Sequence, residues 1–401
     1  MERSLRAVLV GTFLLRFSTG LTGSMLAFYL VHLPEHGGPS VDAVVVGLYS
    51  ALFYLAELVL SPVFGVLSDR YGHHRVMLFG PIFGAVAVVM TALTTNLVVL
   101  GGTRLLEGAS GAASVPSILG FIALATAGNE LLRGKTAARF EGVTLAGLAI
   151  GAISGVKLFE LLGQPAFFVN AALYGVAFLV YKFGVQDPAG EAEAVAGEHV
   201  GFRRYLQLIR TSHVWLLAPT WIALNASIGV WLSQSFFQLA KGDPRFPDQA
   251  LMSGFTANQI IIGGIAVAIV FGAGLWYWGN RFKAMRRTTI IGYGVGGGAV
   301  LVIAGLVTNH LAMTLPVVAI VAGIAAAVGL FVLAGATPAA LGLLADMSER
   351  FPTDRGAIMG LYSVFLALGQ IIGSLIGGVA ADWLGIDGMF LATLALLGIA
   401  V

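Results

Sequence analysis

Five ionisable side chains lie inside long apolar stretches of the sequence, where a charge is costly. They are Arg16, Glu57, Arg104, Glu107 and Lys157. In a lipid environment such residues face the protein interior, pair with one another, or take part in moving ions and substrates. Arg104 and Glu107 are three residues apart and can pair on one helix face. We therefore treat all five as candidates for binding or moving an ion, that is, as coupling candidates if the protein moves one.

Glu57 is the best candidate for a proton carrier. Desolvation at membrane depth disfavours the charged form of a carboxyl, so Glu57 could take up and release a proton. The alternative is a permanent ion pair with Arg16 or Arg104. These arginines can equally serve as salt-bridge partners or as sites for an anion or for coupling.

A second polar group follows one stripe of the apolar stretch at 213–239. Its members are Asn225, Ser227, Trp231, Gln234 and Gln238. Their spacing places most of them on one helix face. Hydrogen-bonding groups orient a ligand and an aromatic ring supplies contact area, so we expect these residues and Thr19 to line a substrate cavity. The alternative is hydrogen bonding between helices.

The composition indicates what must position these residues. Of the 401 residues, 58% are hydrophobic and 10% are charged, whereas a soluble domain has about 25% charged residues. Lipid must therefore cover most of the surface. A spanning helix needs about 20 apolar residues, and lipid does not satisfy the exposed edges of a sheet. We predict an all-α membrane protein with twelve spans: 6–31, 43–67, 76–95, 98–122, 139–161, 165–183, 213–239, 258–279, 288–308, 312–344, 357–382 and 388–401.

Polar and basic residues set the predicted domains and orientation. A polar linker at 185–212 divides six spans at 1–184 from six at 213–401. Lys241 and Arg245 are the bases expected in loops on one side, while most other bases gather on the opposite side. Basic loops stay inside, so we predict a multi-pass protein of the cell membrane with both termini cytoplasmic.

An internal repeat relates the two halves. A shift of 222 residues carries Pro116 onto Pro338, and the pair Arg133-Gly134 onto Arg355-Gly356. It also carries Gly147, Gly151 and Gly155 onto Gly369, Gly373 and Gly377. Parallel repeats of this kind are a transporter architecture, in which two halves rock about a central site.

A motif lies between the second and third predicted spans, and its key residues are Gly65, Asp69, Arg70, Gly72 and Arg75. It resembles the signature of the major facilitator superfamily, although His73 and His74 stand where the family has bases. The resemblance implies two six-helix bundles and a cytoplasmic latch between Asp69 and the helix that begins near Gly356. It also implies that the first, fourth, seventh and tenth helices line the cavity.

The fourth span strengthens this resemblance. The run from Arg104 through Glu107 and Gly108 to Gly111 is similar to a second family signature, which is often linked to proton coupling. The Gly-Pro pair typical of drug/proton antiporters is absent from the stretch that contains Gly147 and Gly155.

We therefore expect a secondary active transporter that moves a small molecule by alternating access, coupled to protons and leaning towards export of amphiphilic or drug-like compounds. Organic anion uptake, lipid or lysolipid flipping, and a non-transporting assembly factor of the same fold remain alternatives. The sequence holds no cysteine and no histidine spacing typical of a metal site. We expect no enzymatic activity, no cofactor, no metal and no nucleic-acid partner, and we expect a functional monomer.

Overall fold

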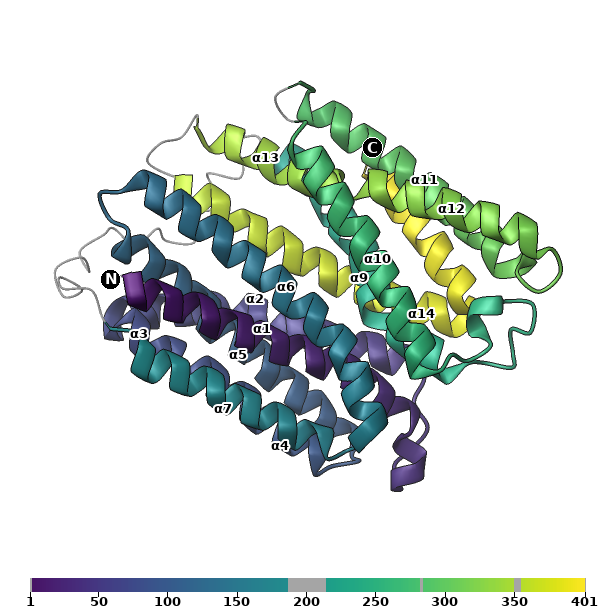
Figure 1. Cartoon of the computed structure of the whole chain (residues 1–401), viewed down its shortest axis with the longest axis horizontal. Coiled ribbons are helices and arrows are strands. Elements are labelled where there is room, and N and C mark those ends of the chain that lie inside the picture. The colour runs from purple at the N-terminus through teal and green to yellow at the C-terminus, as the bar shows by residue number, and fades with distance from the viewer. Residues whose placement is uncertain (1, 187–213, 282–283, 350–354, 401) are drawn as a thin grey trace. The chain divides into compact units, whose positions relative to one another are not determined.

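The computed structural model describes residues 2–186, 214–281, 284–349 and 355–400 (Figure 1). The predicted linker at 185–212 lies almost wholly outside the described residues. None of the described residues forms a β-strand. By their contacts the residues divide into a first unit, Met1–Val41 with Leu52–Glu198, and a second unit, Asp42–Ala51 with His199–Val401.

The first half of the chain holds long helices joined by short connections. They are α1 (Glu2–Val31), η1 (Leu33–His36), α2 (Ala43–Tyr71), α3 (His73–Met77), α4 (Phe79–Ala92), α5 (Leu97–Ala125), α6 (Glu130–Leu162) and α7 (Ala166–Gly184). The second half follows the same plan. It holds α9 (Val214–Lys241), η3 (Ala250–Met252), α10 (Ala257–Gly279), α11 (Arg287–Leu311), α12 (Pro316–Leu333), α13 (Ala336–Glu349) and α14 (Arg355–Ile399).

Most of these helices can cross a bilayer. Among the described residues, eleven helical segments are long and apolar enough to span a membrane. The last of them, Ser363–Ile399, contains Gly385 with φ 62° and ψ −144°. This non-helical residue divides α14 into two helices, which agrees with the predicted division between 357–382 and 388–401.

One predicted span contains a break. The predicted span 312–344 corresponds to the segment Pro316–Leu343, which is long and apolar enough to cross a membrane, but within it α12 ends at Leu333 and α13 begins at Ala336. Pro338 lacks the N–H that would bond to the carbonyl of Ala334, so the helix is interrupted there. Gly335 packs against the ring of Trp278 at this break, with no room for a side chain.

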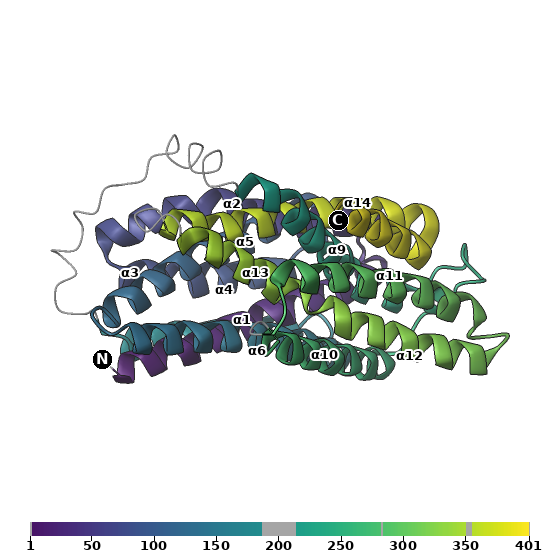
Figure 2. The ribbon, with the colours of Figure 1, turned by 90° about the horizontal axis from the view of Figure 1, so that it is seen from above.

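Glycines set how closely the helices pack in each unit. In the first unit α1 lies along α6, and Gly151 faces the backbone carbonyl of Phe17 (Figure 1). In the second unit α9 lies along α14, and Gly373 faces the carbonyl of Ala226 (Figure 2). A side chain at either glycine would collide with the neighbouring backbone. The repeat predicted from the sequence is thus a repeated helix contact.

Candidate functional site

The most deeply buried charges of the described chain lie on α5. Asn96 caps this helix, and its side chain accepts hydrogen bonds from the backbone N–H groups of Val98 and Val99 at 2.9 and 3.3 Å. Two turns later, Arg104 donates from Nη1 to Oε2 of Glu107, and the two residues are 9% and 3% exposed. The spacing of three residues places both side chains on one face, as predicted. The pair is a fixed, water-excluded dipole inside the first unit.

Arg104 has a further favourable contact with a neighbouring residue, whereas one oxygen of Glu107 has none in the described part of the chain. The guanidinium carbon of Arg104 lies 5.0 Å from the centre of the Phe53 ring, which gives the cation a second favourable contact. Glu107 Oε1 is buried and has no hydrogen-bond partner among the described residues. The carboxylate therefore depends on Arg104 for its stabilisation.

Glu57 on α2 is held much more loosely. Its Oε1 lies 4.0 Å from Nη2 of Arg16 on α1, beyond hydrogen-bonding distance, and the Glu57 side chain is 24% exposed. On α5, a methyl group at Gly111 would lie 2.9 Å from the same oxygen. The glycine therefore leaves the space that the carboxylate uses. Of the partners considered for Glu57, the structure brings Arg16 near it, while Arg104 is paired with Glu107.

Polar residues of α7 border α1 next to this region. Thr19 Oγ1 lies 3.5 Å from the hydroxyl of Tyr174 and donates to the carbonyl of Leu15 at 3.0 Å. Asn170 donates from Nδ2 to the carbonyl of Ser18 at 3.0 Å and to Thr22 Oγ1 at 2.9 Å. The sequence reasoning did not single out Asn170 or Tyr174. Each is a polar residue in the mostly apolar stretch 165–183, and that is the signal that was available.

The loop after α2 is built as the motif requires. Gly72 has φ 96°, a left-handed conformation that favours glycine, and it connects α2 to α3. His73 is buried, packs into the notch at Gly120, and lies 3.9 Å from Asp69 Oδ1 through Nε2. Asp69 keeps half of its side chain exposed. His73, which stands where the family has a base, is therefore packed in the interior and lies close to Asp69.

The remaining motif residues lie at the surface or in ordinary contact. The side chains of Arg70 and Arg75 are exposed, and the Arg70 guanidinium carbon is 5.5 Å from the centre of the Tyr71 ring. A methyl group at Gly65 would lie 3.9 Å from Pro116, an ordinary van der Waals contact. The latch between Asp69 and the helix that begins near Gly356 stays a prediction.

Lys157, the fifth predicted coupling residue, lies near the end of α6. Its Nζ lies 2.5 Å from Glu160 Oε2, and the two side chains are 44% and 38% exposed. This pair is local and accessible. It contrasts with the buried pair on α5.

The predicted cavity residues on α9 are hydrogen-bonded within the second unit. Trp231 donates from Nε1 to Thr393 Oγ1 at 2.9 Å, and Gln234 donates to the carbonyl of Ala43 at 2.9 Å. Gln238 donates to Gln234 at 3.4 Å. Asn225 and Ser227 donate to backbone carbonyls one turn earlier in α9, at Trp221 and Ala223. The contacts of Trp231 and Gln234 run to other helices, whereas those of Asn225, Ser227 and Gln238 lie within α9. A cavity role stays a prediction.

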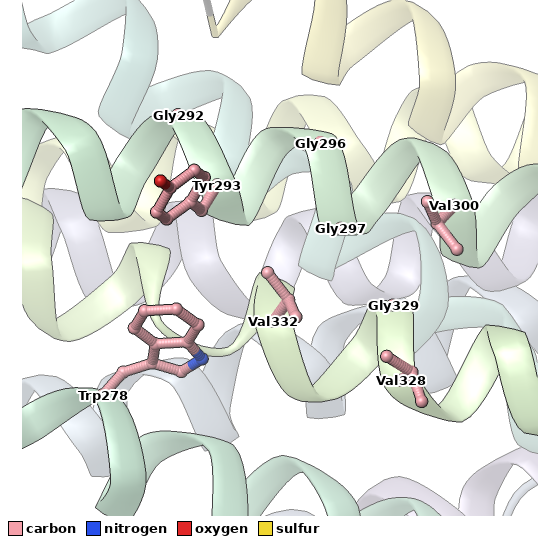
Figure 3. Close-up of a pocket in the computed structure, with 9 residues that line it drawn as sticks. All are labelled: Trp278, Gly292, Tyr293, Gly296, Gly297, Val300, Val328, Gly329 and Val332. Atoms are coloured by element: carbon pink, nitrogen blue, oxygen red, sulfur yellow. The ribbon is translucent and has the colours of Figure 1, made fainter.

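An apolar groove lies elsewhere in the second unit, between α11 and α12 (Figure 3). It encloses about 440 Å³ and is lined by Trp278, Gly292, Tyr293, Gly296, Gly297, Val300, Val328, Gly329 and Val332. Its lining carries no histidine, acidic or basic residue. None of the predicted site residues contributes to it. In the described part of the chain, no cluster of histidine and acidic residues could hold a metal ion.

Comparison with known proteins assigns the family. The sequence pattern described as "Major Facilitator Superfamily" matches residues 8–331, which is most of the chain. This chain belongs to the major facilitator superfamily. Membership makes it a multi-pass membrane transporter of small molecules that works in a lipid bilayer.

Relatives and solved structures agree with this assignment. Multidrug resistance protein 1 of Bacillus subtilis (strain 168) is 24% identical over 383 residues, covering 90% of this chain and 88% of the relative. Quinolone resistance protein NorA of Staphylococcus aureus (strain COL) is 23% identical over 385 residues, covering 95% and 91%.

Two solved transporters show the same fold. The nucleoside transporter NupG superposes with a TM-score of 0.71 at 14% identity, over 100% of this chain and 96% of NupG. The human organic anion transporter MFSD10 superposes with a TM-score of 0.64 at 19% identity, over 100% and 98%. The predicted major facilitator fold, all-helical with twelve spans in two related bundles, is confirmed.

Proposed function

We propose that this transporter exports amphiphilic, drug-like compounds in exchange for protons, with Glu57 as the proton carrier. The names of two relatives that match nearly the whole chain, a multidrug resistance protein and a quinolone resistance protein, support the substrate class. The unequal holding of two carboxyl groups in the first unit supports the carrier.

The main support for Glu57 as the proton carrier is the contrast between Glu57 and Glu107. Glu107 is buried and bonded directly to Arg104, so protonating it would leave a buried cation without its partner. Glu57 is partly exposed and 4.0 Å from Arg16, so it can bind a proton with a smaller loss of attraction. The residue that changes charge during transport is therefore Glu57, and Arg104 with Glu107 is the fixed pair.

Arg16 links the proton to movement of the first bundle. When Glu57 is ionised, the opposite charges draw α1 and α2 together. When Glu57 is neutral, Arg16 loses this attraction, and the two bundles, at 1–184 and 213–401, can change their arrangement. Thr19 lies three residues after Arg16, and we propose that Thr19 and the polar stripe of α9 contact the substrate.

Organic anion uptake receives less support. It was motivated by Arg16 and Arg104, but each of these arginines faces a carboxylate in the structure. An anion from solution would have to compete with a glutamate of the same chain, which is always close to the arginine. No contact among the described residues favours lipid flipping or a non-transporting assembly role.

The test uses the purified chain in proteoliposomes with an imposed pH gradient. The panel holds a quinolone, a fluorescent cationic dye, an organic anion and a lysolipid. We expect gradient-driven flux of the quinolone and the dye, and none of the other two. Flux of the anion or the lysolipid alone would overturn the proposal and identify the correct class.

The motif is proposed to gate the cytoplasmic side, with both termini cytoplasmic. Asp69→Asn removes the acid that would hold the latch, so the inward-open population should rise and transport should slow. Cysteine-accessibility labelling from each side measures the populations, and Glu35→Gln, at an exposed acid outside the motif, serves as a surface control. Unchanged labelling in Asp69→Asn would remove the latch from the mechanism.

A further inference from the structure

A histidine at the end of α11 lies between two carboxylates from different segments. His310 Nε2 is 2.6 Å from Asp387 Oδ2, and Nδ1 is 3.3 Å from Asp248 Oδ2. Asp387 follows the break at Gly385 in α14, and Asp248 belongs to the segment 242–256 between α9 and α10. All three segments meet at the same end of the second unit (Figure 1). We call these three residues the His310 bridge.

Neighbouring amides hold the carboxylates in place. Asn309 donates to Asp387 Oδ1 at 2.8 Å and accepts from the backbone N–H of Leu251 at 2.8 Å. Gln249 donates to the carbonyl of Leu384 at 2.8 Å and accepts from the N–H of Asp387 at 3.3 Å. The segment 242–256 and the turn at Gly385 are therefore already aligned around His310. The histidine contacts both without having to bring them together.

Counting hydrogen-bond donors shows what the bridge requires. A neutral imidazole has one N–H donor and one acceptor nitrogen, whereas an ionised carboxylate only accepts. Two carboxylates at the two ring nitrogens are therefore both satisfied when the ring carries two protons. We propose that the His310 bridge is a proton-dependent contact that strengthens the attachment of the segment 242–256 to α14 when His310 is protonated and weakens it when His310 is neutral.

The other charges in this region do not compete for the same proton. Arg245 lies 2.8 Å from Asp243 and 3.5 Å from Asp382. The side-chain hydrogen bond from Arg245 holds the pKa of Asp243 below its usual range, so Asp243 stays ionised between pH 5 and 8. The groups that face His310 itself are Asp248 and Asp387, with Asn309 as the polar neighbour on its own helix. Histidine ordinarily changes charge within this pH range, and the side chain of His310 is 37% exposed to solvent.

The two contacts differ in what deprotonation would do. The shorter contact, to Asp387, is reinforced by Asn309, so the remaining N–H of a neutral ring stays there. The longer contact, to Asp248, then places a lone pair against a carboxylate. The segment 242–256 loses its contact with His310, while the turn at Gly385 keeps its own. The bridge uses neither Glu57 nor the substrate site, so it stands or falls independently of the proposed export function.

Hydrogen exchange of the purified full chain tests the proposal directly. Amide exchange is followed by mass spectrometry at pH 5.5 and 8.0, with each rate corrected for its intrinsic pH dependence. We expect peptides within 243–255 to exchange roughly threefold to tenfold more slowly at pH 5.5, as the loss of one partly exposed charged hydrogen bond implies. Peptides from 166–184 in the first unit should show no such change.

Two variants separate the bridge from a general effect of pH. His310→Gln cannot be protonated and should remove the pH dependence of 243–255. Asp248→Asn can donate an amide N–H to the unprotonated ring nitrogen, so it should keep the segment protected at both pH values. His36→Gln, a histidine of the first unit, is the matched control and should behave as the wild type. The proposal is overturned by a wild-type segment that is insensitive to pH, by persistent pH dependence in His310→Gln, or by lost protection at pH 8.0 in Asp248→Asn.

Discussion

In the first unit α1 packs on the glycines of α6, and in the second α9 packs on the glycines of α14 in the same register. Phe17 and Ala226 occupy equivalent places opposite Gly151 and Gly373. The next residue back is Arg16 in the first unit and Asn225 in the second. The position that carries the charged Arg16 in the first unit thus carries the neutral amide of Asn225 in the second.

The same difference holds on the helices that carry the second signature. The repeat places Ala326 where the first unit has Arg104, and Gly329 where it has Glu107. Gly329 faces the backbone of α11, where an added methyl would lie 2.6 Å from the carbonyl oxygen of Gly297. The second unit uses for close backbone packing a position that the first uses for a buried carboxylate. The shared contacts build the fold, and the unshared charges are available for coupling.

Breaking the buried pair of the first unit should have the largest effect on stability. Glu107→Gln leaves Arg104 as a buried cation without its counter-charge, which costs about 3–5 kcal/mol in free energy of unfolding. Denaturant unfolding in detergent measures the change.

A double variant serves as the control for that loss. Arg104→Met with Glu107→Met removes both charges and should be more stable than either single variant, because no uncompensated charge remains. Equal stability of Glu107→Gln and the wild type would show that the pair is not holding this part of α5.

Glycine substitutions test whether the two units depend on the same contact. Gly151→Ala and Gly373→Ala each place a methyl group against a backbone carbonyl, so each should cost about 1–3 kcal/mol by overpacking. Thermal unfolding of the purified variants measures both.

Glycines of the same helices that have free space around them should respond in the opposite way, with alanine raising the stability. Gly142 on α6 and Gly398 on α14 have no atom close to the position of an added methyl group. Alanine at either position should raise stability by roughly 0.5–1 kcal/mol through helix propensity. If only one of Gly151→Ala and Gly373→Ala destabilises the chain, the two helix pairs are not equivalent.

A surface ion pair of the second unit should have the smallest effect. Arg245 lowers the pKa of Asp243, so this pair stabilises the folded state above about pH 4 and the contribution is lost as the pH falls through the folded value. Because Arg245 is 56% exposed, Asp243→Asn should cost less than about 1 kcal/mol at pH 7. Thermal melts at pH 7 and pH 3 measure the difference, and a loss that is equal at both pH values would contradict this origin.

Much of the fold was readable from the sequence. The glycines repeat at one offset because helices can approach this closely only where a side chain is missing, and that spacing survives in the printed sequence. The pairing of Arg104 with Glu107 also followed from their spacing of three residues, since neighbours on one helix need no knowledge of the tertiary structure.

Contacts between helices were less predictable. Glu57 could have paired with either arginine, and the choice depends on the register of α1, α2 and α5. The hydrogen bonds of Trp231 and Gln234 were open for the same reason. The helix break at Ala334 was hard to predict, because Pro338 favours a break whereas the continuous apolar run favours a single helix. The packing of His73 into the notch at Gly120 joins residues from separate elements and left no local signal.

Proton-coupled flux in the Glu57→Gln variant shows whether Glu57 carries the proton. Reconstituted wild type, Glu57→Gln and Glu160→Gln are compared for quinolone flux with and without a pH gradient; Glu160 is the carboxylate of the accessible pair on α6. We expect the gradient to drive flux in the wild type and in Glu160→Gln, whereas flux in Glu57→Gln should be independent of the gradient. Full gradient-driven flux in Glu57→Gln would rule out Glu57 as the carrier, because the proton would then travel by another residue.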